Sequence, residues 1–239
     1  GRAICTRFAA EGAEVIAADV APWDTPPEGV AWRALDVTSE EAIRSAFARV
    51  EAEWGPLDVM VTDAGIEIEH TIEETTLEAW NRIFAINVTG TFLAAKQALP
   101  LLRRSDAASV VTIGSYDGSI ADPGLAAYCA TKGAVHALTR AMACDHGPEG
   151  IRVNCICPGY IDTPMLQGFF EGEGSGGGGR MIGELQEAVR GVHPLRTYGT
   201  PEDVANLALW LASDEARYAH GALWVLDGGL SAQVQQMRL

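Results

Sequence analysis

The chain has 239 residues, which is long enough for one well-buried domain and short for two. Its composition, 48% hydrophobic and 21% charged, is ordinary for a globular protein, and its formal net charge of −15 argues against nucleic-acid or anionic-membrane partners. No apolar run reaches membrane-spanning length, and no basic segment precedes an apolar stretch near residue 1. We therefore expect a cytoplasmic protein.

Helical and strand patterns alternate along the chain, which predicts an α/β domain with a parallel sheet and helices on both faces. The predicted helices are residues 2–11, 39–54, 77–103, 126–144 and 201–213. The predicted strands are residues 14–19, 31–36, 57–61, 109–114, 151–157 and 223–226. Ser39 is expected to cap the helix that begins there. The whole of residues 1–239 is predicted to be a single domain.

One stretch departs from this alternation. Residues 171–179 read Glu-Gly-Glu-Gly-Ser-Gly-Gly-Gly-Gly, a composition typical of flexible linkers. Glycines at this density do not support a helix interior. The segment is either the mobile tip of a lid or an engineered replacement for a disordered loop, and both interpretations remain open.

The cysteines show neither a disulfide framework nor the spacing of a zinc site. They are Cys5, Cys129, Cys144, Cys155 and Cys157. Cys155 and Cys157 alternate along a predicted strand, so both thiols are expected on one face of it. This pattern favours buried small apolar residues over metal or redox chemistry.

Tyr128 and Lys132 lie four residues apart in the predicted helix 126–144, so their side chains share one helix face. A nearby ammonium favours the phenolate, so we expect the pKa of Tyr128 to lie below its usual value of about 10. A phenol tuned in this way is a general acid or base. Taken alone, however, the pair is more typical of a half-buried tyrosine beside a solvated lysine.

Several short motifs occur together in a fixed order. They are Asp36-Val37, Asn87-Val-Thr-Gly90, Ser115, Tyr128-x-x-x-Lys132, Pro158-Gly159 with Thr163-Pro164, and Asp227-Gly228-Gly229. Each is weak alone, but the order, with Ser115 thirteen positions before Tyr128, is specific. The set resembles the short-chain dehydrogenase/reductase family over nearly the whole chain. That resemblance implies a Rossmann-like, doubly wound parallel sheet with strand order 3-2-1-4-5-6-7 and a nicotinamide cofactor.

The resemblance also implies catalytic roles. Tyr128 would protonate the oxygen of a carbonyl as hydride reaches its carbon, and act as base in the reverse direction. Lys132 would lower the pKa of Tyr128 and hydrogen-bond the nicotinamide ribose. Ser115 would hold the substrate oxygen, and Asn87 would hold a water in a proton relay. The alternatives are that Ser115 is a turn or cap residue and that Asn87 is an ordinary interior polar residue.

Cofactor contacts follow from the same resemblance. Asp19 ends the second expected strand of the family's sheet, where a carboxylate accepts hydrogen bonds from the adenosine ribose and repels a 2′-phosphate, so NAD is favoured over NADP. Asp19 is otherwise a simple strand-terminating residue. Asp36 and Val37 would flank the adenine. The remaining implied contacts are Gly1, Ala64, Gly65, Pro158, Gly159, Ile161 and Thr163, besides Tyr128 and Lys132.

Two departures from the family pattern matter. The family has asparagine where this chain has Asp63, and an ionised Asp cannot donate the amide hydrogen bonds. Residues 1–4 resemble the end of the family's glycine loop, so the first strand and most of that loop are expected to lie outside residues 1–239. Without that strand, sheet edges are exposed. We expect further N-terminal residues in the working protein, a partner chain that fills the gap, or weak NAD binding.

The implied function is NAD(H)-dependent hydride transfer between nicotinamide and a secondary alcohol or ketone, with no metal. Residues 163–192 are expected to form a flexible substrate lid, in which Met165, Leu166, Phe169 and Phe170 either face the substrate or form a packing face. A homotetramer is expected. The competing hypothesis is a catalytically silent or truncated relative that serves as a scaffold with impaired cofactor binding. The motifs do not distinguish a hydroxysteroid, sugar, cyclic diol or hydroxyacyl substrate.

Overall fold

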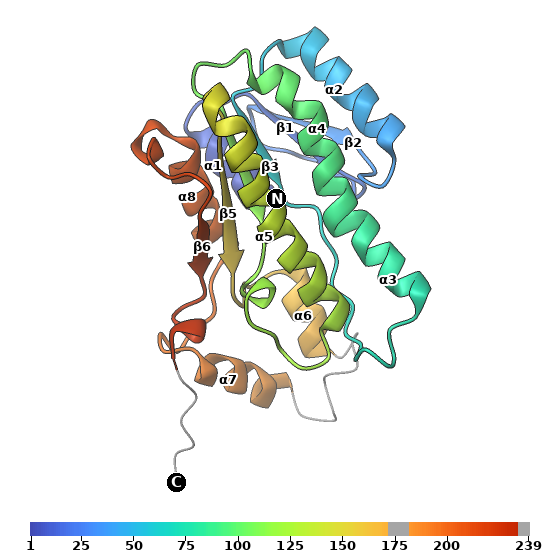
Figure 1. The fold of residues 1–239 in the computed structure, drawn as a ribbon. Coiled ribbons are helices and arrows are strands. Elements are labelled where there is room, and N and C mark those ends of the chain that lie inside the picture. The colour runs from blue at the N-terminus through green and yellow to red at the C-terminus, as the bar shows by residue number, and fades with distance from the viewer. Residues whose placement is uncertain (172–181, 234–239) are drawn as a thin grey trace.

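Parallel strands form the middle layer of the computed structural model, and helices cover both faces of them (Figure 1). The structure describes residues 1–171 and 182–233. The strands are β1 (Val15–Asp19), β2 (Val30–Ala34), β3 (Val59–Thr62), β4 (Ser109–Ile113), β5 (Arg152–Pro158) and β6 (Leu223–Leu226). The α-helices are α1 (Arg2–Ala10), α2 (Glu40–Trp54), α3 (Leu77–Phe84), α4 (Thr91–Leu102), α5 (Ala126–His146), α6 (Pro164–Glu171), α7 (Ile182–Val192) and α8 (Pro201–Ala212). The predicted α/β fold is confirmed.

The strands form two separate hydrogen-bonded groups. β1 pairs with β2, and the other four pair in the order β3-β4-β5-β6, all in parallel. Set against the predicted order 3-2-1-4-5-6-7, these groups take positions 3-2 and 4-5-6-7. Within the described ranges no strand takes position 1, between β1 and β3.

Adjacent side chains of β4 point to opposite faces of the sheet, as in any strand. Val110 packs into a core against α4 and α5, and Val111 into a core against α1 and α8. The first core includes Met60, Ala98, Leu102, Val110, Met142 and Ile151. The second includes Ile4, Phe8, Val111, Ile156, Val204, Ala208 and Leu211. These two cores hold the ends of β4 and β5, where the candidate site lies.

The predicted helix 77–103 is interrupted at its centre. Residues Ala85–Gly90 form a π-helix between α3 and α4. The Thr91 hydroxyl donates to the Asn87 carbonyl over 2.9 Å. Gly90 lies so close to Val37 that a Cβ on it would come within 2.8 Å of the Val37 Cγ2. The expectation of one regular helix is therefore wrong here, and the π-helix falls at the motif residue Asn87, in keeping with the tendency of such turns to mark functional sites.

Local signals were otherwise reliable. The Ala42 amide donates to the Ser39 hydroxyl over 3.2 Å, which confirms the predicted N-cap. The helix that carries Tyr128 runs two residues further than expected, to His146. In residues 1–171 and 182–233, no helix combines the length and apolar character that crossing a membrane requires.

Candidate active site

The four predicted catalytic residues come from three elements that meet at the carboxyl end of β4. Ser115 follows β4, Tyr128 and Lys132 lie on the first turns of α5, and Asn87 lies in the π-helix. All four are buried, with exposed fractions of 5%, 8%, 7% and 2% respectively. The Ser115 hydroxyl lies within hydrogen-bonding reach of Tyr128. The structure thus brings together residues that are up to 45 positions apart in the sequence.

Tyr128 does not have the lowered pKa that the sequence led us to expect. Burial raises the pKa of Tyr128, the Glu67 carboxylate adds to this, and the hydrogen bond with Ser115 only partly offsets it. The Lys132 ammonium lies 5.4 Å from the centre of the Tyr128 ring and donates to the Ile113 carbonyl over 3.1 Å. Burial also lowers the pKa of Lys132 itself. Desolvation therefore outweighs the attraction between the two groups.

Asn87 acts as a clamp between three segments. Its side-chain oxygen accepts from the Ile66 amide and its nitrogen donates to the Ile66 carbonyl, both over 2.9 Å. The same nitrogen donates to the Thr131 hydroxyl over 3.1 Å. The amide thereby ties the segment after β3 to the helix of Tyr128 and Lys132. These contacts fit an interior polar residue that positions the backbone, and the water relay that the resemblance implies stays a prediction.

Acidic side chains surround the candidate catalytic hydroxyls. The Ser115 hydroxyl donates to Asp117 over 3.3 Å and accepts from the Asp117 amide over 3.2 Å. Burial, with the charge of Asp122 adding to it, raises the pKa of Asp117 to about 6. Burial and the neighbouring Glu69 raise the pKa of Glu67 to about 7. These groups were not predicted, because the carboxylates near Ser115 and Ile66 belong to no recognisable motif.

Asp122 links the loop after β4 to the segment after β5. Its carboxylate accepts from the Tyr160 hydroxyl over 2.8 Å and also from the Tyr116 hydroxyl. The two aromatic rings lie 6.0 Å apart, centre to centre. This bridge holds the Ser115 loop against the segment that begins at Pro158.

The segment predicted to hold the nicotinamide follows β5 directly. The Gly159 amide donates to the Leu226 carbonyl over 2.9 Å, and a Cβ on Gly159 would lie 2.8 Å from that of Asp227. Ile161 pairs with Gly199 in an isolated bridge, and the Thr163 hydroxyl donates to the Ile161 carbonyl over 3.2 Å. Only glycine fits at position 159, so the closing Asp-Gly-Gly motif and the Pro-Gly motif are in contact.

The residues predicted to bind the adenosine side lie nearer the surface. Asp19 ends β1 with an exposed carboxylate, of which one oxygen accepts from the Ala21 amide over 2.9 Å. Hydrogen bonds from the hydroxyl and the amide of Thr38 lower the pKa of Asp36. Val37 packs on Gly90. The Asp19 side chain thus stands exposed at the carboxyl end of a strand, where α/β sheets bind ligands.

Gly1, Ala64 and Gly65 lie around the same edge. Gly1 precedes α1, and a Cβ on it would be 3.0 Å from the Asp63 carboxylate. Ala64 and Gly65 follow β3, and a Cβ on Gly65 would be 3.4 Å from the Asn87 side-chain oxygen. These residues fit a nicotinamide dinucleotide. The N-terminus of α1 suits a phosphate, the Asp19 carboxylate suits a ribose, and Lys132 is buried with donors that remain for the cofactor.

The predicted lid is helical where the structure describes it, in α6 and α7. Leu166 and Phe170 are buried and pack with Val189 of α7, whereas Met165 is exposed. The packing-face alternative therefore holds for Leu166 and Phe170. The glycine-rich segment 172–179 lies outside the described residues.

Comparison with known proteins identifies the class. A family model described as enoyl-(acyl carrier protein) reductase matches residues 1–231. Inactive 2-(S)-hydroxypropyl-CoM dehydrogenase 2 of Xanthobacter autotrophicus is 40% identical over 202 residues, 82% of this chain and 83% of that protein. Meso-2,3-butanediol dehydrogenase of Serratia marcescens is 34% identical over 246 residues, which cover 100% of this chain and 93% of that protein. Ligand-free aldohexose dehydrogenase of Thermoplasma acidophilum superposes with a TM-score of 0.93 at 33% identity, covering 100% of this chain and 92% of that one.

The chain therefore belongs to the short-chain dehydrogenase/reductase family, as the motifs predicted. Relatives across the family are named as alcohol dehydrogenases, and the family uses NAD(P) cofactors.

Proposed function

We propose that this protein is an NAD(H)-dependent oxidoreductase that interconverts a secondary alcohol and its ketone, with Tyr128 as general acid and base. The observation that carries the proposal is the burial of Ser115, Tyr128 and Lys132 together at the carboxyl end of β4. In a dry site, a hydroxyl pair and an ammonium act strongly on the charge that develops at a substrate oxygen.

The nicotinamide, when bound, accepts or supplies the hydride. Ser115 would hold the substrate oxygen, and Tyr128 would give it a proton during reduction or remove its proton during oxidation. Because the pKa of Tyr128 is raised, the phenol is protonated at neutral pH and is ready to act as an acid. Alcohol oxidation should therefore accelerate as pH rises.

Lys132 and Asn87 would support this proton transfer. The Lys132 ammonium has three donors, of which one binds the Ile113 carbonyl, and the others suit ribose hydroxyls. Asn87 positions the segment after β3 through Ile66 and the helix α5 through Thr131. The remaining cofactor contacts are proposed for Gly1, Asp36, Val37, Ala64, Gly65, Pro158, Gly159, Ile161 and Thr163.

NAD is the proposed cofactor because of Asp19. Its exposed carboxylate lies at the end of β1, where it would accept from the ribose hydroxyls and repel the additional phosphate of NADP. The acidic side chains near Ser115 further favour a substrate that is neutral rather than anionic around the reacting carbon.

The test is NAD reduction with a panel of secondary alcohols. Tyr128→Phe should lower the rate by roughly 10² to 10⁴-fold, the usual contribution of a general acid or base. Tyr218→Phe, at an almost fully exposed tyrosine, is the matched control and should leave the rate unchanged. Equal rates in Tyr128→Phe and the wild type would refute the assigned mechanism.

The second candidate, a catalytically silent scaffold, is supported by the 40% identical relative that is named as inactive. It is distinguished by fluorescence titration with NADH. Saturable binding supports the enzyme, whereas no binding at high micromolar NADH supports the scaffold.

We also propose a homotetramer. Large apolar side chains are exposed on the long helices and on the last strand, namely Leu77, Phe92 and Val225. Light scattering on the purified chain tests this assembly, and a monomeric mass would contradict it.

A further inference from the structure

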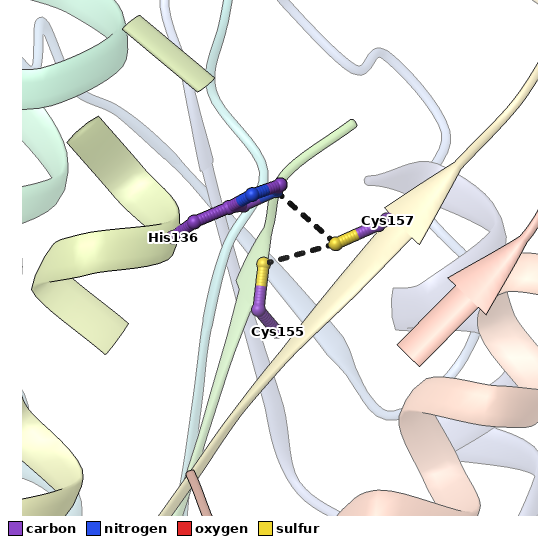
Figure 2. Close-up of side chains that lie close together, drawn as sticks. All are labelled: His136, Cys155 and Cys157. Atoms are coloured by element: carbon purple, nitrogen blue, oxygen red, sulfur yellow. Dashed lines mark hydrogen bonds between the residues drawn. The ribbon is translucent and has the colours of Figure 1, made fainter. Parts of the chain in front are cut away.

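A histidine and two cysteines meet between α5 and β5. Figure 2 shows His136 of α5 directed toward Cys155 and Cys157 of β5. The two thiols share one face of the strand and are buried, as predicted, but their contact with His136 was not predicted. The exposed fractions of the three residues are 2%, 0% and 1%.

The three potential ligand atoms form a small triangle. The Cys157 Sγ lies 3.2 Å from the His136 Nε2 and 3.8 Å from the Cys155 Sγ, and all three atoms lie within 4.8 Å of one another. In a tetrahedral zinc site with Zn–S of about 2.3 Å and Zn–N of about 2.0 Å, the S···S edge is about 3.8 Å and the S···N edge about 3.5 Å. The sulfur pair already has this spacing, and the imidazole Nε2 needs to withdraw from the Cys157 Sγ by only about 0.3 Å.

Neighbouring residues complete the arrangement. A Cβ on Gly114 would lie 2.6 Å from the His136 Nε2 and 2.7 Å from the Cys155 Sγ, so glycine keeps that side of the triangle free of a side chain. On the opposite side of the ring, the Ser119 hydroxyl lies 3.5 Å from the His136 Nδ1. A partner at Nδ1 holds the proton there and leaves the Nε2 lone pair directed at the thiols, as in ligating histidines.

Charge also suits a dication. Two thiolates and a neutral imidazole carry two negative charges, which a divalent ion neutralises. That balance matters because an uncompensated charge is costly at a buried site.

We propose that His136, Cys155 and Cys157 bind one thiophilic closed-shell dication of the Zn²⁺ type, with a water at the fourth position. Binding replaces two S–H bonds with two metal–sulfur bonds and releases two protons to solvent, so affinity rises with pH. The proposed metal site is adjacent in sequence to the candidate active site. His136 lies one turn after Lys132 on α5, and Cys157 directly precedes Pro158. Gly114, beside the triangle, directly precedes Ser115. It does not depend on the proposed function.

The test is a titration of the full chain with Cd²⁺, followed through the ultraviolet thiolate-to-metal charge-transfer band. We expect saturation at one equivalent per chain. Cys155→Ala, Cys157→Ala and His136→Gln should each weaken binding by more than the roughly 100-fold upper effect of outer-shell changes. Cys144→Ala, at an exposed cysteine of the same helix, is the matched control and should bind as the wild type does.

A wild-type chain that gives no saturable band, or a Cys157→Ala variant that retains the wild-type band, overturns the proposal. If a variant fails to fold by circular dichroism, X-ray absorption of the zinc-loaded wild type decides. Two sulfur atoms at about 2.3 Å and one nitrogen at about 2.0 Å support the site, and a shell of oxygen and nitrogen alone overturns it.

Discussion

The two groups of strands differ in how they present their functional residues. β4 and β5 are buried along nearly their whole length, whereas β1 and β2 are exposed at their carboxyl ends. β4 and β5 are paired on both edges and packed on both faces, whereas β1 pairs with β2 alone in the part of the chain that the structure describes. The candidate proton-transfer groups therefore lie in a desolvated setting, and Asp19 lies at a solvated surface. Under the proposed function, burial would govern proton transfer near β4, and the exposed charge of Asp19 would govern cofactor selectivity near β1.

The largest effect on stability is expected beside the buried strand group β3–β6, at Asn87. Asn87→Ala removes both partners of the Ile66 backbone and a donor to Thr131, so it should lower the free energy of unfolding by about 3 kcal/mol or more. Chemical denaturation measures the loss. Asn81→Ala, at an exposed position of α3, is the control. Equal losses in the two variants would show that the hydrogen bonds of the Asn87 side chain do not stabilise the fold.

Glu67 tests whether burial governs this half. Since its pKa is raised from 4.5 to about 7, the protonated carboxyl contributes stability that is present below pH 4.5 and lost as pH rises through about 7. The shift of about 2.5 units sets an upper limit of about 3 kcal/mol. Glu67→Gln should weaken the pH dependence of thermal unfolding between pH 5 and 8 and leave the part that Asp117 contributes, whose pKa is raised to about 6.

The same variant should lower the pKa of Tyr128, because the Glu67 charge is one cause of its elevation. Its alcohol oxidation profile should then move to lower pH. Glu73→Gln, at an exposed position, provides the control for both measurements. If Glu67→Gln changes neither the pH profile of alcohol oxidation nor the pH dependence of unfolding, the buried Glu67 carboxyl does not influence Tyr128.

Gly90 is one of the contacts between the π-helix and the segment after β2. Gly90→Ala places a Cβ within 2.8 Å of Val37 and should cost roughly 1–3 kcal/mol through overpacking. Gly183→Ala, in α7 with no atom near the new Cβ, should instead be neutral or slightly stabilising. A Gly90→Ala variant as stable as the wild type would show that Val37 does not restrict the side chain at position 90.

Asp19 sharpens the other side of the comparison. Asp19→Asn should shift the ratio of kcat/KM for NAD over NADP by on the order of tenfold toward NADP, the size of one lost charge repulsion near water. Unfolding should stay as in the wild type, since Asp19 is exposed. Asp24→Asn is the control, and an unchanged ratio in Asp19→Asn would assign cofactor selectivity elsewhere.

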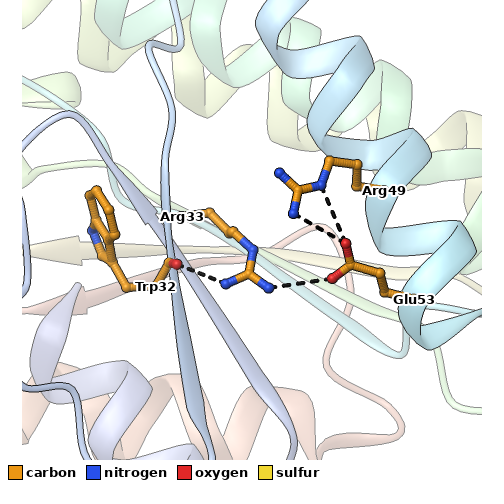
Figure 3. A network of polar contacts seen from close by, with 4 residues as sticks. All are labelled: Trp32, Arg33, Arg49 and Glu53. Atoms are coloured by element: carbon orange, nitrogen blue, oxygen red, sulfur yellow. Dashed lines mark hydrogen bonds and ion pairs between the residues drawn. The ribbon is translucent and has the colours of Figure 1, made fainter.

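The smallest effect is expected in the surface network of β2 and α2. Figure 3 shows Arg33 and Arg49 both directed at Glu53. Arg33 donates to the Trp32 carbonyl over 2.9 Å and to Glu53 over 3.3 Å, and Arg49 donates to Glu53 over 3.1 Å. These charges are screened by solvent, so Glu53→Gln should leave the thermal midpoint unchanged within error. A clear drop in the thermal midpoint would show that this exposed network of charges stabilises the fold despite screening by solvent.

Much of the fold was predictable because its signals are local. The cap at Ser39 and the shared helix face of Tyr128 and Lys132 depend on residues a few positions apart, and both are present in the structure. The π-helix at Asn87 was not predicted, and the contacts around it, such as that of Gly90 with Val37, join segments that are distant in sequence.

The sequence by itself determined the alternation of strands and helices, the order of the motifs and the family to which the chain belongs. Only the tertiary structure decided that the pKa of Tyr128 is raised, that Asn87 clamps Ile66, and that His136 meets Cys157. The physical reason is that helix periodicity and caps arise within a few residues. Desolvation and ligand geometry are instead sums over neighbours that distant segments bring together only when the chain folds.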